Sequence, residues 1–333
     1  MKWPTGGADQ GILDVTDQTT QARRSTSAGG TSLLRGLVRE ARPKQWAKNV
    51  LVFVAPAAAG VLDPTENLYY LRITLLAFVA FCLVSSATYM LNDILDVESD
   101  RAHPTKRTRP IAAGIVPIPV AVVSAVVLFV AGVAIALLNR GLDAGPNWPL
   151  AATVAGYAVL TTLYSFRLKQ IAVIDLVVLS AGFILRLLGG AYAAGVDVSD
   201  WFLVISLFGS LFIAAAKRHA ETVELGDQAH LLRPTLGEYS IEYLGFARSV
   251  AAAGTVISYC LWAVEAGSEG AAAAVATPWA QLSIIPMLIA VLRYALLVDQ
   301  GKGSAPEDVI LHDRQMQVMG LLLVVCIFVG VYL

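Results

Sequence analysis

The stretch "LRITLLAFVAFCLVSSATYMLN" (residues 71–92) is almost entirely apolar, and it leads directly into "DILDVESDRAHPTKRTRP" (residues 93–110). An apolar run of roughly 20 residues is long enough to cross the hydrocarbon core of a bilayer as a helix. The segment that follows places three aspartates ahead of a block of Lys and Arg. The two stretches together predict a membrane-spanning helix that ends in a charged site.

The composition of the whole chain agrees with a membrane location. Of its 333 residues 56% are hydrophobic and only 15% are charged, whereas soluble domains are nearer 45–50% apolar and about 25% charged. We therefore predict an all-α, polytopic membrane protein in contact with lipid. The predicted spans, about nine, are residues 49–62, 71–92, 115–138, 148–166, 171–194, 201–217, 244–265, 272–298 and 317–333.

The distribution of charge sets the expected orientation and excludes one class of partner. Lys and Arg concentrate before the first predicted span and in every second connection after it. The positive-inside rule then places the N-terminus and the charged site in the cytoplasm, with the chain as a multi-pass protein of the cell (inner) membrane. The net charge of −1 provides no basic field for nucleic acid, so no nucleic-acid partner is expected.

The chain divides into a tail and one transmembrane region. Residues 1–30 are polar, rich in Gly, Ser and Thr, and without apolar period, so we predict a disordered N-terminal tail. Residues 31–333 form the predicted transmembrane domain. Its three cysteines, Cys82, Cys260 and Cys326, all lie inside apolar spans and lack the spacing of a metal site.

The aspartates at the end of the second span form a candidate metal site. On a helix Asp93, Asp96 and Asp100 fall within roughly 60° of one another, with Asn92 beside Asp96. Oxygen ligands of this kind suit Mg²⁺, which commonly shares its coordination shell with a substrate phosphate. The alternative is a solvated helix end whose acids happen to align.

Cationic residues follow the aspartates and suit phosphate groups. They are His103, Lys106, Arg107 and Arg109. A second cluster follows the sixth span, where Lys217, Glu221 and Glu224 share a helix face beside Arg218. An ordinary surface pair between Lys217 and Glu221 remains an alternative there.

Further polar residues lie in or beside the predicted spans. Lys44 and Lys48 precede the first span, and Tyr164 and Lys169 close the fourth; all four suit either a ligand or lipid headgroups. Arg186 lies inside the fifth span, where a charge is costly. It either pairs with an acid or contacts a ligand.

The motif "NDILDVESD" (residues 92–100) resembles the N-D-x-x-D-x-x-x-D signature of the UbiA superfamily of intramembrane prenyltransferases. This resemblance implies nine transmembrane helices around a central cavity open to the cytoplasm, and a diphosphate bound through Mg²⁺. Within the superfamily, "RPKQWAKN" (42–49), "DVESDRAHPTKRTRPIAAG" (96–114) and "AKRHAE" (216–221) resemble the decaprenyl-phosphate phosphoribosyltransferases. That similarity runs from about Arg39 to the C-terminus.

The resemblance implies a specific reaction. Such an enzyme transfers 5-phosphoribose from phosphoribosyl pyrophosphate to a polyprenyl (decaprenyl) phosphate and releases pyrophosphate, for arabinan and cell-envelope synthesis. The second aspartate motif of ordinary prenyltransferases is replaced here by Lys217, Arg218 and Glu221, which suits anionic substrates. The expected roles are as follows: catalytic, Asp93, Asp96, Lys217 and Arg218; metal-binding, Asp93, Asp96 and Asp100; substrate-binding, Lys44, Lys48, Asn92, His103, Lys106, Arg107, Arg109, Tyr164, Lys169, Arg186 and Glu221.

Two alternative functions belong to other classes. A UbiA-type prenyltransferase would use a prenyl diphosphate donor to make a quinone or haem precursor. An anion transporter should show broken spans with charges near the membrane midplane, whereas most charges here cluster at the predicted cytoplasmic ends. A homo-oligomer is compatible with all of these functions.

Overall fold

The computed structural model describes residues 32–62, 68–103, 105–141, 145–225, 234–269, 279–302, 309 and 312–332. These residues form helices and connecting turns and contain no strand, which confirms the prediction of an all-α fold. The predicted disordered tail, residues 1–30, lies outside the described residues.

Within the part of the chain that the structure describes, seven helical segments are long and apolar enough to span a membrane. They are α3 (Leu68–Leu95), α5 (Ile118–Leu138), α6 (Trp148–Phe166), α7 (Ile174–Ala194), α8 (Asp200–Leu225), α11 (Ile241–Glu269), and the consecutive α12 (Trp279–Leu282) and α13 (Ile284–Asp299). A shorter apolar segment, Arg314–Gly330, lies in α15 (Arg314–Tyr332). These helices coincide with every predicted span except the first, so the count of nine is not confirmed.

The first predicted span has a different structure. Residues Pro43–Phe53 form a 3₁₀ helix, η1, and Val54–Ala58 form the short helix α2. Pro56 lacks the amide hydrogen that a longer helix needs, and Gly60 has a positive φ of 73° just beyond α2. The remaining short elements are α4 (Val97–Ala102), α10 (Pro234–Glu238), η2 (Lys106–Thr108) and η3 (Leu168–Gln170).

Contacts between residues divide the chain into two compact units. The smaller unit comprises the residues up to Trp46 together with Ser85–Phe129, and the larger unit comprises Ala47–Val84 together with Val130–Leu333. Each unit has hydrophobic cores of its own. A single transferase domain over residues 31–333 stays a prediction.

The hydrophobic core of the smaller unit forms between a helix at residues 32–40 and the segment that follows η2. Ile111, Val116 and Ala121 are buried there, and Leu33, Leu37, Ile94 and Val97 pack against them. Gly36 allows the close approach, since a Cβ atom at this position would lie 2.8 Å from a methyl of Val116. This packing fixes the segment that carries the cationic block next to the end of α3.

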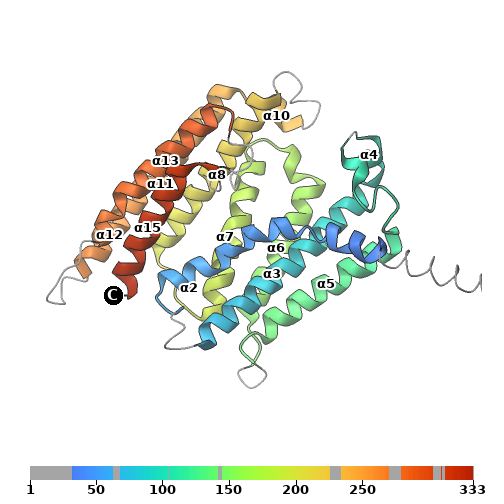
Figure 1. The fold of residues 1–333 in the computed structure, drawn as a ribbon, viewed down its shortest axis with the longest axis horizontal. Helices are drawn as coiled ribbons and strands as arrows, with labels where there is room; N and C mark the ends of the chain where they lie inside the picture. The colour runs from blue at the N-terminus through green and yellow to red at the C-terminus, as the bar shows by residue number, and fades with distance from the viewer. Residues whose placement is uncertain are drawn as a thin grey trace, which may run out of the picture. The chain divides into compact units, whose positions relative to one another are not determined.

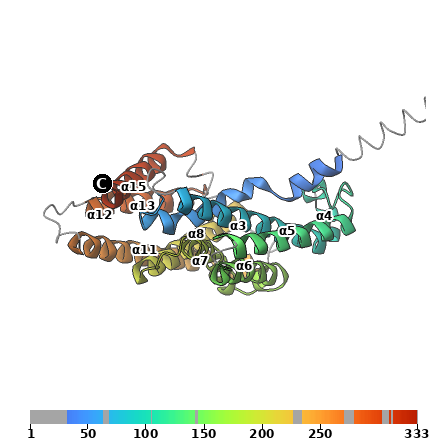
Figure 2. The same ribbon diagram turned by 90° about the horizontal axis from the view of Figure 1, so that it is seen from below.

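The larger unit has two main cores. One joins α3, α6 and α7, where the rings of Phe81 and Tyr157 meet edge to face with centroids 5.6 Å apart. The other joins α8, α11 and α13 around Phe212 and Tyr294. Helix α8 lies alongside α11, and α13 alongside α15, as Figures 1 and 2 show.

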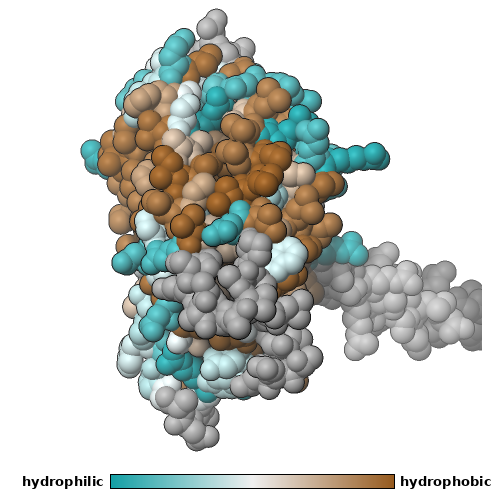
Figure 3. Space-filling view, turned by 90° about the vertical axis from the view of Figure 1, so that its left-hand side faces the viewer, coloured by the Kyte–Doolittle hydropathy of each residue, from teal (hydrophilic) through white to brown (hydrophobic). Residues whose placement is uncertain are grey.

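The outer faces of these helices are apolar. Ile285 and Leu292 on α13, and Leu321 and Val324 on α15, are exposed. Figure 3 shows a broad apolar surface, bordered by hydrophilic side chains, on the side of the molecule at the left of Figure 1. Surfaces of this kind are stable against lipid rather than against water.

A close backbone approach between η1 and α7 generates a stability prediction. A Cβ atom on Gly190 of α7 would lie 1.8 Å from the carbonyl oxygen of Val52 in η1, a contact that backbone movement alone can relieve. We expect Gly190→Ala to cost about 3 kcal/mol of stability, at the upper end of typical overpacking costs. Thermal unfolding of the protein in detergent measures the loss.

Gly182→Ala is the matched control on the same helix. Its added Cβ atom would have no neighbour nearer than 3.7 Å, so the variant should be at least as stable as the wild type. Equal melting temperatures for the two variants would contradict the tight packing of η1 on α7.

Candidate active site

Two buried carboxylates in the smaller unit are held by two arginines. Arg109 Nη1 donates to Asp93 Oδ1 at 2.9 Å and to Asp100 Oδ2 at 2.6 Å. Arg42 Nη2 donates to Asp93 Oδ1 at 2.6 Å and also contacts Oδ2. The side chains of Asp93 and Asp100 are 1% and 3% exposed, whereas those of Arg42 and Arg109 are 26% and 27% exposed. The arginines therefore cover the acids.

The helix geometry explains why Asp93 and Asp100 meet. Helix α3 ends at Leu95 and α4 begins at Val97, with Asp96 at the junction (φ −91°, ψ 8°). The amides of Asp96 and Asp100 still bond to the carbonyls four residues earlier, at 2.9 and 2.8 Å, so the helical phase continues through the junction. The side chain of Asp96 accepts a hydrogen bond from Asn92 Nδ2 at 3.1 Å.

This cluster fits the chemistry of a divalent cation. Two carboxylates converge on one positively charged nitrogen of Arg109. Their oxygens are ligands of the kind that a hard cation binds. No group of three or more His, Cys, Asp or Glu side chains within the described residues is close enough to hold a metal ion. Asp96 would therefore have to turn toward the other two acids to complete a metal site, which stays a prediction.

Arg42 is a residue of this cluster that the sequence analysis did not assign to the site. Its backbone is left-handed, with φ of 49°, and its guanidinium lies 5.1 Å from the ring centre of Tyr89. The turn that carries it is fixed on both sides. Glu40 accepts from the amide of Ile111 at 2.8 Å, and Ser86 Oγ donates to the carbonyl of Ala41 at 2.8 Å.

Glu40 has an altered acidity in this setting. Burial is the largest cause that raises its pKa, from 4.5 to about 7, and the nearby Asp93 adds to the effect. The amide of Ile111 acts in the opposite direction. The carboxyl of Glu40 is thus partly protonated near neutral pH.

The raised pKa predicts a pH dependence of stability. The folded protein retains a proton on Glu40 that the unfolded chain has released, so the free energy of unfolding falls as the pH rises from 4.5 to about 7. This contribution to the free energy of unfolding is about 3 kcal/mol at its full size, and it is absent in Glu40→Gln. The melting temperature of the variant relative to wild type should rise between pH 5 and pH 8. A melting-temperature difference that stays constant between pH 5 and pH 8 would contradict the raised pKa of Glu40.

The other cations predicted between residues 44 and 107 are exposed or half-buried. Lys106 and Arg107 are exposed on η2, and Lys44 is exposed on η1, where Lys48 is half-buried. His103 is half-buried, and its Nδ1 accepts from the amide of Thr105 at 3.2 Å. The structure therefore brings Arg109, rather than the rest of the cationic block, onto the acids.

A second cluster lies in the larger unit around Arg218, whose side chain is only 1% exposed. Its Nε donates to Asp175 Oδ2 at 2.8 Å, its Nη1 to Glu221 Oε2 at 2.5 Å, and its Nη2 to the hydroxyl of Tyr164 at 2.8 Å. Arg218 thus joins Asp175, Glu221 and Tyr164 in one hydrogen-bonded cluster, and its catalytic role stays a prediction. Lys217 is half-buried on the same helix.

Asp175 links this cluster to the chain around η3. It accepts from the Tyr239 hydroxyl at 2.6 Å, and that hydroxyl oxygen accepts from the amide of Val173 at 2.5 Å. Val173 has a φ of 68°, which is strained for a β-branched residue. Thr235 Oγ1 also donates to the carbonyl of Lys169 at 3.1 Å. Burial, and then the contact with Asp175, raise the pKa of Tyr239.

Arg186 is buried in α7 among uncharged groups. Its Nε donates to Asn49 Oδ1, its Nη1 to the carbonyl of Gly182 and its Nη2 to the hydroxyl of Tyr157, each at 2.7 Å. Its guanidinium also lies 4.5 Å from the ring centre of Tyr157. These contacts join η1, α6 and α7, so Arg186 has a structural role in this geometry; ligand contact stays a prediction.

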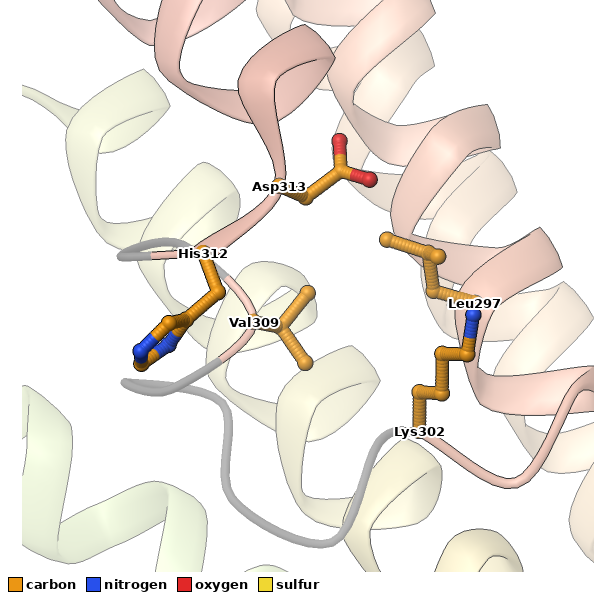
Figure 4. Close-up of a pocket in the computed structure, with 5 residues that line it drawn as sticks. All are labelled: Leu297, Lys302, Val309, His312 and Asp313. Atoms are coloured by element: carbon orange, nitrogen blue, oxygen red, sulfur yellow. The ribbon is translucent and has the colours of Figure 1, made fainter.

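A cavity of about 330 Å³ lies between α13 and the start of α15. Figure 4 shows its lining residues, Leu297, Lys302, Val309, His312 and Asp313. None of these residues is among the predicted site residues, and Asp313 already accepts from Arg293 Nη2 at 2.6 Å. None of the five lining residues belongs to either charged cluster.

Comparison with known proteins places this chain in a family. The model of the UbiA prenyltransferase family matches residues 50–332. The chain belongs to the UbiA prenyltransferase family. Membership, together with the seven apolar helices, makes it a multi-pass membrane protein.

Two UbiA relatives carry the same name. Decaprenyl-phosphate phosphoribosyltransferase of Corynebacterium glutamicum is 42% identical over 302 residues, which cover 91% of this chain and 88% of that protein. Decaprenyl-phosphate phosphoribosyltransferase of Mycolicibacterium smegmatis is 38% identical over 324 residues, which cover 96% of this chain and 99% of that protein.

The UbiA fold is also evident from a solved structure. A UbiA homologue from Archaeoglobus fulgidus, bound to GPP and Mg²⁺, superposes with a TM-score of 0.63 at 15% sequence identity. The match covers 90% of this chain and all of that one. At this identity the similarity concerns the fold alone.

The buried pair in this UbiA protein generates a stability prediction. Arg218→Met leaves the carboxylate of Asp175 buried without its guanidinium, which typically costs about 3–5 kcal/mol. Arg293→Met is the control, because the pair of Arg293 with Asp313 is more exposed and worth about 0–1 kcal/mol. Thermal unfolding of both variants measures the difference.

A double variant separates a structural role of Arg218 from a catalytic one. Arg218→Met combined with Asp175→Leu removes both charges and should recover much of the lost stability. If Arg218→Met is as stable as Arg293→Met but loses affinity for substrate, Arg218 is a ligand of the substrate and the structural role is wrong.

Proposed function

We propose that this protein transfers 5-phosphoribose from phosphoribosyl pyrophosphate to a polyprenyl phosphate, with release of pyrophosphate. The observation that carries the proposal is the pairing of Asp93 and Asp100 with Arg42 and Arg109 in a UbiA family member. Relatives of 38–42% identity that span nearly the whole chain bear the corresponding name.

The charge requirements of the substrates support this reaction. Phosphoribosyl pyrophosphate carries a diphosphate and a 5-phosphate, and the lipid acceptor carries a further phosphate. Arginine and lysine bind such groups through charge-assisted hydrogen bonds. In the smaller unit, the cationic residues Arg42, Lys106, Arg107 and Arg109 supply donors for these phosphates. A neutral acceptor would not need so many.

The bond changes require no general base. An oxygen of the lipid phosphate, already an anion at neutral pH, forms a bond to C1 of the ribose while the bond from C1 to the diphosphate breaks. Attack opposite the leaving group inverts the anomeric centre. Arg42 and Arg109 bind phosphate oxygens, and Arg218 holds Glu221 and Tyr164 in place.

Asp93, Asp96 and Asp100 would hold Mg²⁺. When bound, the ion neutralises charge on the diphosphate leaving group. The lipid tail lies among the apolar helices, with its phosphate at the cytoplasmic face of the cell (inner) membrane, where the N-terminus also lies. The product serves arabinan synthesis for the cell envelope.

An assay with the purified protein tests the proposal. Labelled phosphoribosyl pyrophosphate and polyprenyl phosphate should yield a labelled lipid in the presence of Mg²⁺. Asp93→Asn should lower turnover at least a hundredfold, the effect expected when a group that stabilises the leaving charge is lost. Asp197→Asn, an exposed change just beyond α7, is the control and should retain full turnover.

Two outcomes would overturn the assignment. Near-wild-type turnover by Asp93→Asn at ordinary Mg²⁺ concentrations would remove the metal site. Turnover of a prenyl diphosphate in place of phosphoribosyl pyrophosphate would instead make the protein a prenyltransferase.

A further inference from the structure

We propose that Arg109 and Arg42 compete with a divalent cation for the carboxylates of Asp93 and Asp100, so that the cation binds tightly only together with a diphosphate. This inference rests on the proposed function, because it takes Asp93 and Asp100 as metal ligands. It adds a coupling between the binding of the metal and the binding of the phosphoribosyl donor, and this coupling arises from two arginines of this chain.

The contacts show that the arginines already use the oxygens that a metal would need. Asp93 Oδ1 accepts from both arginines, and its Oδ2 is in contact with Arg42. Asp100 Oδ2 accepts from the same Nη1 of Arg109. A cation that binds both carboxylates must therefore displace at least this nitrogen.

Each of the two carboxylates is paired with a positive charge. Asp93 faces the guanidinium groups of Arg42 and Arg109, and Asp100 faces that of Arg109. Addition of a divalent cation without movement of the arginines would place like charges within a few ångströms of each other, partly shielded from water. Metal entry therefore requires the arginines to leave.

The structure allows this movement in the side chains. Roughly a quarter of each arginine side chain is exposed, whereas the acids beneath are buried. The backbone is held instead, since Glu40 binds the amide of Ile111 and Ser86 binds the carbonyl of Ala41. Displaced guanidinium groups thus stay near the cluster and can bind an anion that carries the metal.

The consequence is a reciprocal coupling. A diphosphate that binds the displaced arginines strengthens metal binding, and the metal strengthens diphosphate binding by the same factor. Metal alone competes with the arginines and binds weakly. The cluster is therefore selective for the complex of metal and diphosphate over either component alone.

Binding of Mn²⁺ to the purified full-length protein, without phosphate compounds, tests the inference. The paramagnetic resonance signal of free Mn²⁺ reports the bound fraction. Arg109→Gln should bind Mn²⁺ roughly ten- to a hundredfold more tightly than wild type, the range expected when one hydrogen bond to a charged competitor is lost. Arg39→Gln, an exposed change in the same unit, is the charge-matched control and should bind as wild type.

A second measurement uses pyrophosphate as the probe. Mg²⁺ with pyrophosphate should raise the melting temperature of wild type much more than Mg²⁺ alone. In Arg109→Gln, Mg²⁺ alone should already raise it. Arg42→Gln, which loses contacts to Asp93 only, should show the same trend to a smaller extent, and it serves if Arg109→Gln does not fold.

The variants separate this inference from the proposed metal site. If Asp93→Asn abolishes Mn²⁺ binding while neither Arg109→Gln nor Arg42→Gln strengthens it, the arginine competition is wrong and the metal site stands. If Asp93→Asn binds Mn²⁺ as well as wild type, the metal site itself is wrong and the inference fails with it.

Discussion

A charge buried in a largely apolar chain must be compensated by its immediate neighbours, and this constraint organises the structure. In the smaller unit, the carboxylates of Asp93 and Asp100 are covered by arginines from two other segments. In the larger unit, Asp175 and Arg218 compensate each other inside the protein. Removal of one partner from such a pair costs far more than the pair contributes, because the remaining charge stays desolvated. Segments distant in sequence are thereby fixed relative to the helices within each unit.

Much of the fold could be predicted from the sequence, because apolar runs of bilayer length need no tertiary information to be recognised. The exception is instructive. Residues 49–62 are apolar, yet they form the end of η1 and the short α2, because Pro56 interrupts the helix and Gly190 of α7 admits the backbone of Val52. Pro56 was visible in the sequence, whereas the approach of Val52 to Gly190 depends on the fold.

Helical spacing predicts Asp93, Asp96 and Asp100 on one stripe. The structure brings Asp93 and Asp100 onto Arg109, whereas Asp96 accepts from Asn92. Their role as metal ligands stays a prediction. The pairing of Asp93 with Arg42 joins positions 51 residues apart, which no local pattern can reveal. The sequence predicts Arg218 as a site residue, which stays a prediction, whereas its burial against Asp175 depends on contacts between helices. The sequence identifies the charged groups, while the fold determines which of them form ion pairs with each other.

The charge of Arg186 fixes the orientation of the uncharged polar side chains around it. Asn49 turns its carbonyl oxygen toward the guanidinium, so its amide nitrogen points away and donates to the sulfur of Cys82 at 3.3 Å. Tyr157 likewise presents its hydroxyl oxygen to the same cation. A single positive charge thus orients the side-chain dipoles of Asn49 in η1 and Tyr157 in α6. Through Asn49 the alignment extends to Cys82 in α3. In a medium of low polarisability such an ordered chain of dipoles spreads the charge over several groups, which makes a lone cation tolerable at membrane depth.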